Sequence, residues 1–129
     1  TGAYKDRMKF RLAETYLLLA EAYLRQDMPD KAADAVNEVR RRAKVSDVSD
    51  EEMTMDFLLD ERIRELYGEE SRRFTLIRTG KLLERVRKYN PEARDLIQDF
   101  HVLWPIPQAI RDANVGNFPQ NPGYEGYEG

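Results

Sequence analysis

The stretch that decides the fold extends from Arg11 to Tyr23 and reads Arg-Leu-Ala-Glu-Thr-Tyr-Leu-Leu-Leu-Ala-Glu-Ala-Tyr. Its apolar residues recur at the i, i+4, i+7, i+8 and i+11 spacing that one face of an α-helix presents. Other apolar residues widen this face, and only a narrow polar line remains through Glu14, Glu21 and Arg25. A helix that is apolar on most sides is normally buried on most sides. We therefore expect this helix to need several neighbouring helices.

A predicted turn at residues 26–30 leads into a second helix, which we expect to begin at Pro29 and to end near Ala43. The pair matches the tetratricopeptide template, a helix–turn–helix unit with small residues where the helices cross. One such unit cannot bury its own faces, so it needs neighbours. Five residues fall at template spacings and are predicted to pack the two helices together: Tyr16, Ala20, Tyr23, Ala32 and Val36.

The rest of the chain predicts three more helices and then an irregular tail. The helices are expected at 54–67, 70–79 and 81–89, after a polar loop at 45–53. Gly80 either separates the last two or is tolerated inside one bent helix. Ser49 and Thr54 compete as the N-cap of the first of these three helices.

After Pro91, four prolines between Trp104 and Pro122 predict an extended tail over 91–129 that packs on the helices, with a short helix or turn at 110–113. The predicted fold is all-α, with tetratricopeptide-like helical hairpins and a proline-rich irregular tail.

Composition excludes several classes of function. The 129 residues carry 21 basic and 24 acidic side chains, a net charge of −3 that does not favour a nucleic-acid surface. Without cysteine, the chain has no disulfide, thiolate zinc site or cysteine nucleophile. No apolar run approaches the roughly 18–20 residues that cross a bilayer. The sequence begins at Thr1 with neither Met nor a signal-peptide pattern, and we expect it to be the C-terminal part of a longer protein, with residues 1–129 forming one segment.

Asp60, Glu61 and Glu65 form the densest acidic cluster on a predicted helix. Paired carboxylates can act as acid and base on a glycosidic bond. Neighbouring arginines lower carboxylate pKa values, however, which is unsuitable for a general acid. We therefore predict no catalytic residue, and structural ion pairs in which Glu61 or Glu65 meets Arg72 or Arg78.

Two residues of the predicted tail with aromatic rings are candidate site residues. His101 is the only histidine and lacks the partners of a metal site or a base–nucleophile pair, so we expect it to pack or to form hydrogen bonds. Trp104 is a weak candidate for a sugar platform, but its apolar neighbours favour a tail anchored in the core. No metal and no cofactor is predicted.

Three blocks of the chain, in order, resemble the C-terminal region of the SusD/RagB family of outer-membrane nutrient-binding lipoproteins. The blocks are residues 11–23, residues 60–81, and Leu103-Trp-Pro-Ile-Pro107 followed by Gln120-Asn-Pro-Gly-Tyr124. Together they cover nearly the whole chain. Two positions depart from the family pattern: Arg73 stands where the family often has an aromatic residue, and Thr75 where it often has Asp.

The resemblance implies a non-enzymatic function for the parent protein. Family members are surface-exposed lipoproteins of the outer membrane, held by an N-terminal lipidated cysteine. They bind glycans or other nutrients and cap a SusC-like TonB-dependent transporter. Their sugar contacts come largely from outside this region, so no ligand-binding residue is assigned here. The charge balance predicts no nucleic-acid partner. The resemblance implies membrane contact only through the upstream lipid anchor.

Two other readings of the sequence remain open. A generic tetratricopeptide-type adaptor would bind a peptide partner in a helical groove. A glycoside-processing fragment would use the region around Glu61. The first would show further 34-residue repeats, and the second would hydrolyse a glycan.

Overall fold

The computed structural model describes residues 10–127, so the chain start at Thr1 and the last two residues of the terminal Tyr-Glu-Gly lie outside the described residues. Within that range the chain holds six α-helices, one 3-10 helix and no strand, which confirms the all-α prediction. The helices belong to two compact units, one ending at Glu70 and the other beginning at Ser71. No helix between residues 10 and 127 has the length and hydropathy to cross a membrane.

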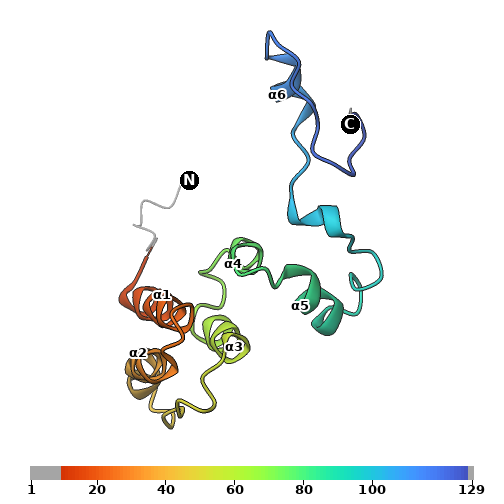
Figure 1. Ribbon diagram of the computed structural model, residues 1–129. Coiled ribbons are helices and arrows are strands. Elements are labelled where there is room, and N and C mark those ends of the chain that lie inside the picture. The colour runs from red at the N-terminus through yellow and green to blue at the C-terminus, as the bar shows by residue number, and fades with distance from the viewer. Residues whose placement is uncertain (1–9, 128–129) are drawn as a thin grey trace, which may run out of the picture. The chain divides into compact units, whose positions relative to one another are not determined.

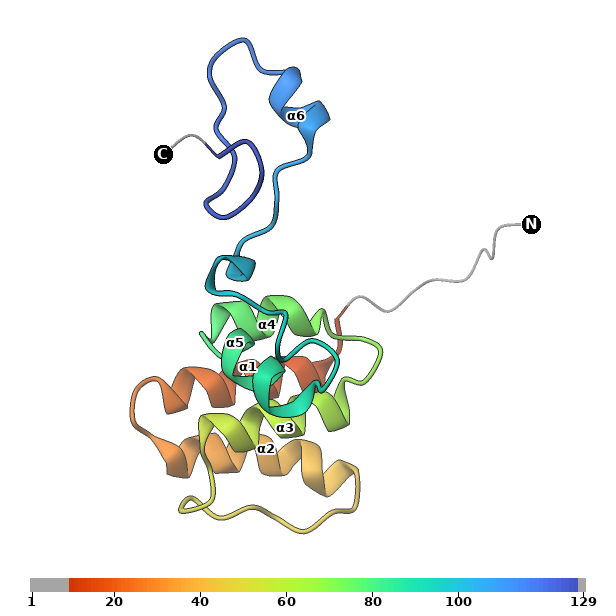
Figure 2. The ribbon, with the colours of Figure 1, turned by 90° about the vertical axis from the view of Figure 1, so that its right-hand side faces the viewer.

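The first unit is built around a helical hairpin of α1 (Leu12–Leu24) and α2 (Pro29–Arg42), which lie side by side in Figures 1 and 2. Asp27 takes a positive φ of 58° in the turn between them. Pro29 opens α2 at a position where its missing N–H has no intrahelical partner to lose. The predicted turn and both predicted helices are therefore present.

Small residues let the two helices approach each other. Ala20 and Ala32 are fully buried, together with Leu17 and Val36. By contrast, the expectation that α1 would be buried on most sides is wrong for three leucines that remain exposed: Leu12, Leu18 and Leu19. The reason is that α1 contacts only α2 and α3 closely, so part of its wide apolar surface has no neighbour within the first unit.

Helix α3 (Met55–Glu65) completes the first unit and contacts α1. Thr54 is its N-cap, since Thr54 Oγ1 accepts a hydrogen bond from Phe57 N at 3.1 Å. Ser49 forms the reciprocal bonds of a capping box with Glu52, but these close a turn in the loop and start no helix. The helix ends two residues before the predicted Tyr67, and its Ile63 is 44% exposed.

The loop between α2 and α3 is fixed by one buried side chain of α2. Asn37 donates from Nδ2 to the carbonyl of Val48 at 3.0 Å and accepts from the Val48 N–H at 2.8 Å. Val48 and Met53 are buried as a result. A polar loop thus becomes part of the core through an amide that satisfies both backbone groups of one residue.

The second unit begins with α4 (Arg72–Arg78) and α5 (Leu82–Tyr89), which contact each other. Gly80 separates them with a φ of 70°, in the left-handed region that favours glycine. A 3-10 helix, η1 (Asp99–Val102), and α6 (Gln108–Asp112) follow, and the rest of the tail is irregular as predicted. The predicted short helix at 110–113 corresponds to α6, which begins two residues earlier.

Within the tail, two distant segments bind each other and form what we call the tail clasp, residues 103–107 with 120–124. The buried Gln120 accepts from Ile106 N at 2.7 Å and donates to Ile106 O at 2.9 Å. Asn121 Nδ2 donates to Trp104 O at 2.7 Å, and the Tyr124 hydroxyl donates to Leu103 O at 2.8 Å. The two motifs of the third family-like block therefore form one folded element.

Candidate functional site

The acidic residues of α3 hold the three helices of the first unit together. Glu65 has a side chain only 9% exposed and pairs with Arg11, at the start of α1, and with Arg42, at the end of α2. The Arg42 Nη2 atom lies 2.6 and 2.8 Å from the two carboxylate oxygens. Arg11 also donates to the carbonyl of Glu65 and, at 2.6 Å, to the carboxylate of Glu69. One carboxylate thus joins all three helices.

Glu61 lies one turn earlier on α3 and connects α3 to α2 through a second group of ion pairs. Its Oε2 atom lies 2.9 Å from Arg40 Nη1 and 2.7 Å from Arg64 Nη2. The guanidinium carbons of both arginines lie 5.5–5.6 Å from the centre of the Phe57 ring, within cation–π range. Arg40 also donates to the carbonyl of Ser46 at 2.7 Å, which ties the loop after α2 to the same group.

Arg62 is the most deeply buried charged residue of the first unit, at 1% exposure. Its Nε donates to Glu70 at 2.9 Å, and its Nη2 lies 3.9 Å from Glu14 of α1. A buried guanidinium is tolerated only when carboxylates surround it, because an unpaired charge is costly away from water. Sequence reasoning did not identify Arg62 as buried, since the helical period alone does not reveal its two carboxylate partners.

The ion pairs between the arginines and the acidic residues of the first unit favour fixed charges over proton transfer. The hydrogen bond from Arg11 lowers the pKa of Glu69, and in turn the hydrogen bonds to Glu69 and Glu65 raise the pKa of Arg11. A carboxylate bound to guanidinium groups cannot supply the proton that a general acid needs at neutral pH. The arrangement is therefore suited to holding helices together.

The predicted ion-pair residues are brought together only in part. Glu61 and Glu65 lie close together on α3, with the arginine partners described above from α1, α2 and α3. Arg72 and Arg78 form the two ends of α4, in the second unit. Pairing of Glu61 or Glu65 with Arg72 or Arg78 stays a prediction. The partners that sequence reasoning missed are Arg11, Arg40 and Arg42, although Arg11 opens the stretch that decides the fold.

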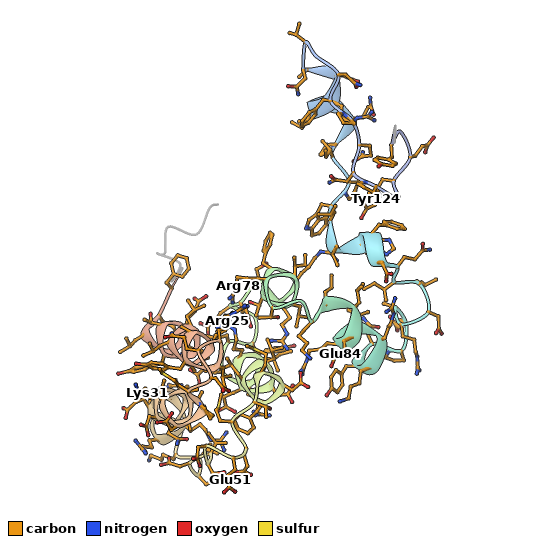
Figure 3. The ribbon with its side chains drawn as sticks, viewed as in Figure 1. Arg25, Lys31, Glu51, Arg78, Glu84 and Tyr124 are labelled. Atoms are coloured by element: carbon orange, nitrogen blue, oxygen red, sulfur yellow. The ribbon has the colours of Figure 1, made fainter. Side chains whose placement is uncertain are left out.

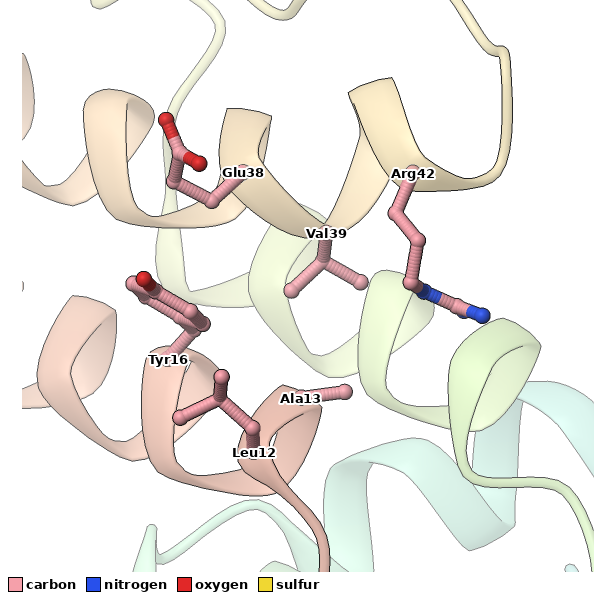
Figure 4. Close-up of a pocket in the computed structure, with 6 residues that line it drawn as sticks. All are labelled: Leu12, Ala13, Tyr16, Glu38, Val39 and Arg42. Carbon is pink, nitrogen blue, oxygen red and sulfur yellow. The ribbon is translucent and has the colours of Figure 1, made fainter.

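The predicted helix-packing residues all lie on the hairpin. Ala20, Ala32 and Val36 are fully buried, whereas Tyr16 and Tyr23 are half-buried. The two tyrosines line shallow depressions along the seam of α1 and α2 and leave part of their rings exposed, and Figure 4 shows Tyr16 opposite Val39 of α2 at one of these depressions.

Trp104 lies at the start of the tail clasp with 56% of its surface exposed. One face of the indole is covered by Arg73 of α4, whose guanidinium carbon is 4.3 Å from the ring centre. Arg73 also donates to the carbonyl of His101. The tail is thus anchored to α4 by stacking, with the indole outside the core of the second unit. Arg73 makes this contact from the position where the family often carries an aromatic residue, and the other indole face remains a candidate sugar platform.

His101 has the packing and hydrogen-bonding role expected of it. Its Nδ1 accepts a hydrogen bond from the Gln98 N–H at 2.8 Å, and its ring lies beside those of Phe100 and Tyr124. Across residues 10–127, the structure shows no group of three histidine, aspartate or glutamate side chains that could hold a metal ion.

The known proteins to which this chain is similar all belong to one family. The sequence profile of the SusD family matches residues 1–124. The chain is 36% identical over 113 residues to the SusD-like protein P25 of Formosa agariphila, covering 79% of this chain and 21% of that protein. It is 35% identical over 125 residues to the starch-binding protein SusD of Bacteroides thetaiotaomicron, covering 90% of this chain and 21% of that protein. No solved structure gives a significant match.

The chain spans about one fifth of the length of these relatives. The profile match covers all three blocks on which the resemblance rests: residues 11–23, residues 60–81, and the two motifs of the tail clasp. The chain belongs to the SusD family.

Proposed function

We propose that this chain forms the C-terminal scaffold of a non-enzymatic, nutrient-binding lipoprotein on the outer face of the outer membrane. The nutrient is a glycan, and the complete protein caps a SusC-like TonB-dependent transporter. The observation that carries this proposal is the SusD-family match across residues 1–124. It is supported by the name of one relative, the starch-binding protein SusD of Bacteroides thetaiotaomicron. Family membership favours this function over that of a generic peptide-binding adaptor.

A scaffold role accounts for the chemistry of the first unit. The carboxylates that sequence alone offers for catalysis, Glu61 and Glu65, are each bound by two arginines. These pairs hold α1, α2 and α3 in one arrangement. We therefore propose that glycan contacts come from other parts of the complete protein and that this segment contributes no catalytic group.

Calorimetry with a panel of soluble glycans tests the proposal. The full-length protein, prepared without its lipid anchor, should bind at least one glycan, and the 129-residue chain should bind none. Specific binding by the 129-residue chain alone would place the ligand site here and contradict the scaffold role. A Trp104→Ala variant of the full-length protein should keep its affinity within about two-fold, which is less than the loss of a stacking contact would cause.

Two further measurements address the partner and the absence of catalysis. Affinity purification of the tagged full-length protein from outer membranes should recover a TonB-dependent transporter. Incubation of the same protein with the bound glycan should release no new reducing ends. Hydrolysis that disappears in a Glu65→Gln variant would instead establish a glycoside-processing enzyme.

A further inference from the structure

One hydrogen bond of the tail requires His101, the only histidine of the chain, to be uncharged. Its Nδ1 atom accepts from the Gln98 N–H at 2.8 Å, and the His101 N–H donates to the Gln98 carbonyl at 3.0 Å. Together these bonds close the single turn of η1. An imidazole nitrogen accepts a hydrogen bond only while it carries no proton, whereas a backbone N–H can only donate. The turn is therefore compatible with the neutral ring and not with the imidazolium ion.

The charged groups that contact η1 also disfavour a positive charge on His101. Arg73 of α4 donates to the His101 carbonyl, and Arg87 of α5 lies 3.2 Å from the carboxylate of Asp99. Asp99 has a side chain 88% exposed and already paired with Arg87, so it compensates little for an imidazolium two residues away. Both cations on η1 thus favour the neutral histidine, because like charges repel.

His101 is also the group around η1 whose charge changes in mildly acidic solution. A histidine side chain ordinarily takes up a proton at about pH 6.5, whereas arginine, lysine, tyrosine and carboxylate groups ordinarily keep their charge between about pH 5.5 and 7.5. The other titratable side chains of the neighbouring segments belong to these last classes: Arg72 and Arg78 of α4, Glu84, Arg85, Lys88 and Tyr89 of α5, Glu92, Arg94 and Asp95 before η1, and Tyr124 and Glu125 near the C-terminus.

The rings of η1 connect this turn to the tail clasp. The ring centres of His101 and Phe100 are 4.3 Å apart, and Phe100 meets Tyr124 edge to face at 5.0 Å. Tyr124, labelled in Figure 3, donates its hydroxyl to the Leu103 carbonyl and so belongs to the clasp itself. The backbone at Gly123 packs closely on the same Phe100 ring. Opening of the η1 turn therefore withdraws the rings against which residues 120–124 pack.

We propose that neutral His101 keeps the tail clasp closed and that its protonation opens the clasp, so that mildly acidic solution releases residues 103–107 from residues 120–124. An imidazolium ring places an N–H opposite the Gln98 N–H, and two donors cannot form a hydrogen bond. The closed clasp thus binds fewer protons than the open one. Its stability is present above the ordinary histidine value and is lost as the pH falls below it. This inference concerns the tail alone and depends on neither the glycan nor the transporter.

Opening of the clasp also changes the surroundings of Trp104. Arg73, whose guanidinium carbon lies 4.3 Å from the centre of the indole ring, is bound to the His101 carbonyl. The Trp104 carbonyl accepts from Asn121 in the closed clasp. Both contacts are lost when η1 and the clasp open, so protonation uncovers the indole face that Arg73 covers at neutral pH.

Hydrogen exchange in the full-length protein tests the proposal, with mass spectrometry of peptides that cover residues 98–107. Exchange rates measured at pH 7.5 and 5.5 are converted to protection factors, which removes the change of the intrinsic exchange rate with pH. If only the open form takes up the proton at about pH 6.5, the protection factor should fall about ten-fold between the two conditions. Peptides of α1, which contain no histidine, report whether the rest of the protein stays folded. Equal protection of residues 98–107 at both pH values would overturn the proposal.

Two variants assign the effect to His101. His101→Asn keeps an acceptor, the side-chain oxygen, close to the position of Nδ1 and does not titrate, so the clasp should stay protected at both pH values. His101→Ala removes the acceptor, and the clasp should be about ten-fold less protected than in the parent protein already at pH 7.5. A pH-dependent loss that persists in His101→Asn, or a His101→Ala variant as protected as the parent at pH 7.5, would contradict the proposal.

Discussion

At the scale of single residues, Glu65 is the group whose loss should matter most in the first unit. It accepts hydrogen bonds from Arg11 and Arg42 while remaining 9% exposed, so a Glu65→Gln variant leaves two guanidinium groups without their shared charge. We expect the free energy of unfolding to fall by about 2 kcal/mol, between the values for exposed and fully buried pairs. Urea denaturation of the 129-residue chain, followed by circular dichroism, measures this loss.

A matched control lies on the same unit. Glu51 is exposed in the loop after α2, and Figure 3 shows its side chain at the edge of the first unit. Glu51→Gln should change the unfolding free energy by less than about 0.5 kcal/mol. If both variants unfold at the same urea concentration as the parent, Glu65 does not connect the helices energetically.

The Arg11–Glu69 pair makes a prediction about pH. Because the hydrogen bond from Arg11 lowers the pKa of Glu69, the folded state favours the ionised carboxylate. The resulting stabilisation is present above the unfolded pKa of about 4.3 and is lost as the pH falls through the lower folded value. Carbon-detected NMR titration should therefore give Glu69 a pKa below that of a free glutamate.

An Arg11→Met variant isolates the cause of that shift. Without the guanidinium, the pKa of Glu69 should rise towards its ordinary value. The pKa of Glu52 should stay low in the same variant, since it is lowered by hydrogen bonds from the backbone and hydroxyl of Ser49. A Glu69 pKa that does not move in Arg11→Met would show that the pair is absent in solution.

At the scale of helices, the close approach of α1 and α2 depends on alanine at the crossing. Ala20 is fully buried, whereas Ala22, two residues along the same helix, is exposed. Ala20→Leu must push the helices apart, and we expect it to lower the unfolding free energy by about 1–3 kcal/mol. Ala22→Leu adds the same atoms at the surface and should have little effect. Thermal unfolding measures the melting temperatures of the two variants. Equal melting temperatures would contradict close packing at Ala20.

Helix boundaries show what local sequence can and cannot predict. Thr54 and Ser49 carry equivalent capping signals, and both make their capping hydrogen bonds. Only the bonds of Thr54 begin a helix, because Leu58 and Leu59 follow at the positions that the core buries. Local propensity thus identifies candidate ends, and tertiary burial selects between them.

At the scale of the whole chain, the order of the helices and the irregular tail follow from periodicity and from proline positions. The ion pairs that join α1, α2 and α3 do not follow from such patterns. Arg11 and Glu65, for example, are 54 residues apart, and no local pattern pairs them. The same holds for Arg73, whose contact with Trp104 replaces an expected core anchor. Exposure of Leu12 and Leu19 could not be predicted either, since it depends on which helices are near rather than on the helix itself.

The tail clasp brings residues 14 to 21 positions apart into contact, and Gly123 is the position at which it is most sensitive to substitution. Gly123 has a φ of 85°, and a Cβ atom added there would come within 2.7 Å of Phe100 Cβ and closer still to its ring. Gly123→Ala should therefore displace Phe100 and weaken the bonds of Gln120 and Tyr124 to residues 103–106. Hydrogen exchange should show about ten-fold faster exchange at the Ile106 amide, which donates to Gln120, while peptides of α1 provide an internal reference. Gly116→Ala is the control, because it meets no atom within 4 Å, and unchanged exchange in both variants would mean that the clasp does not form in solution.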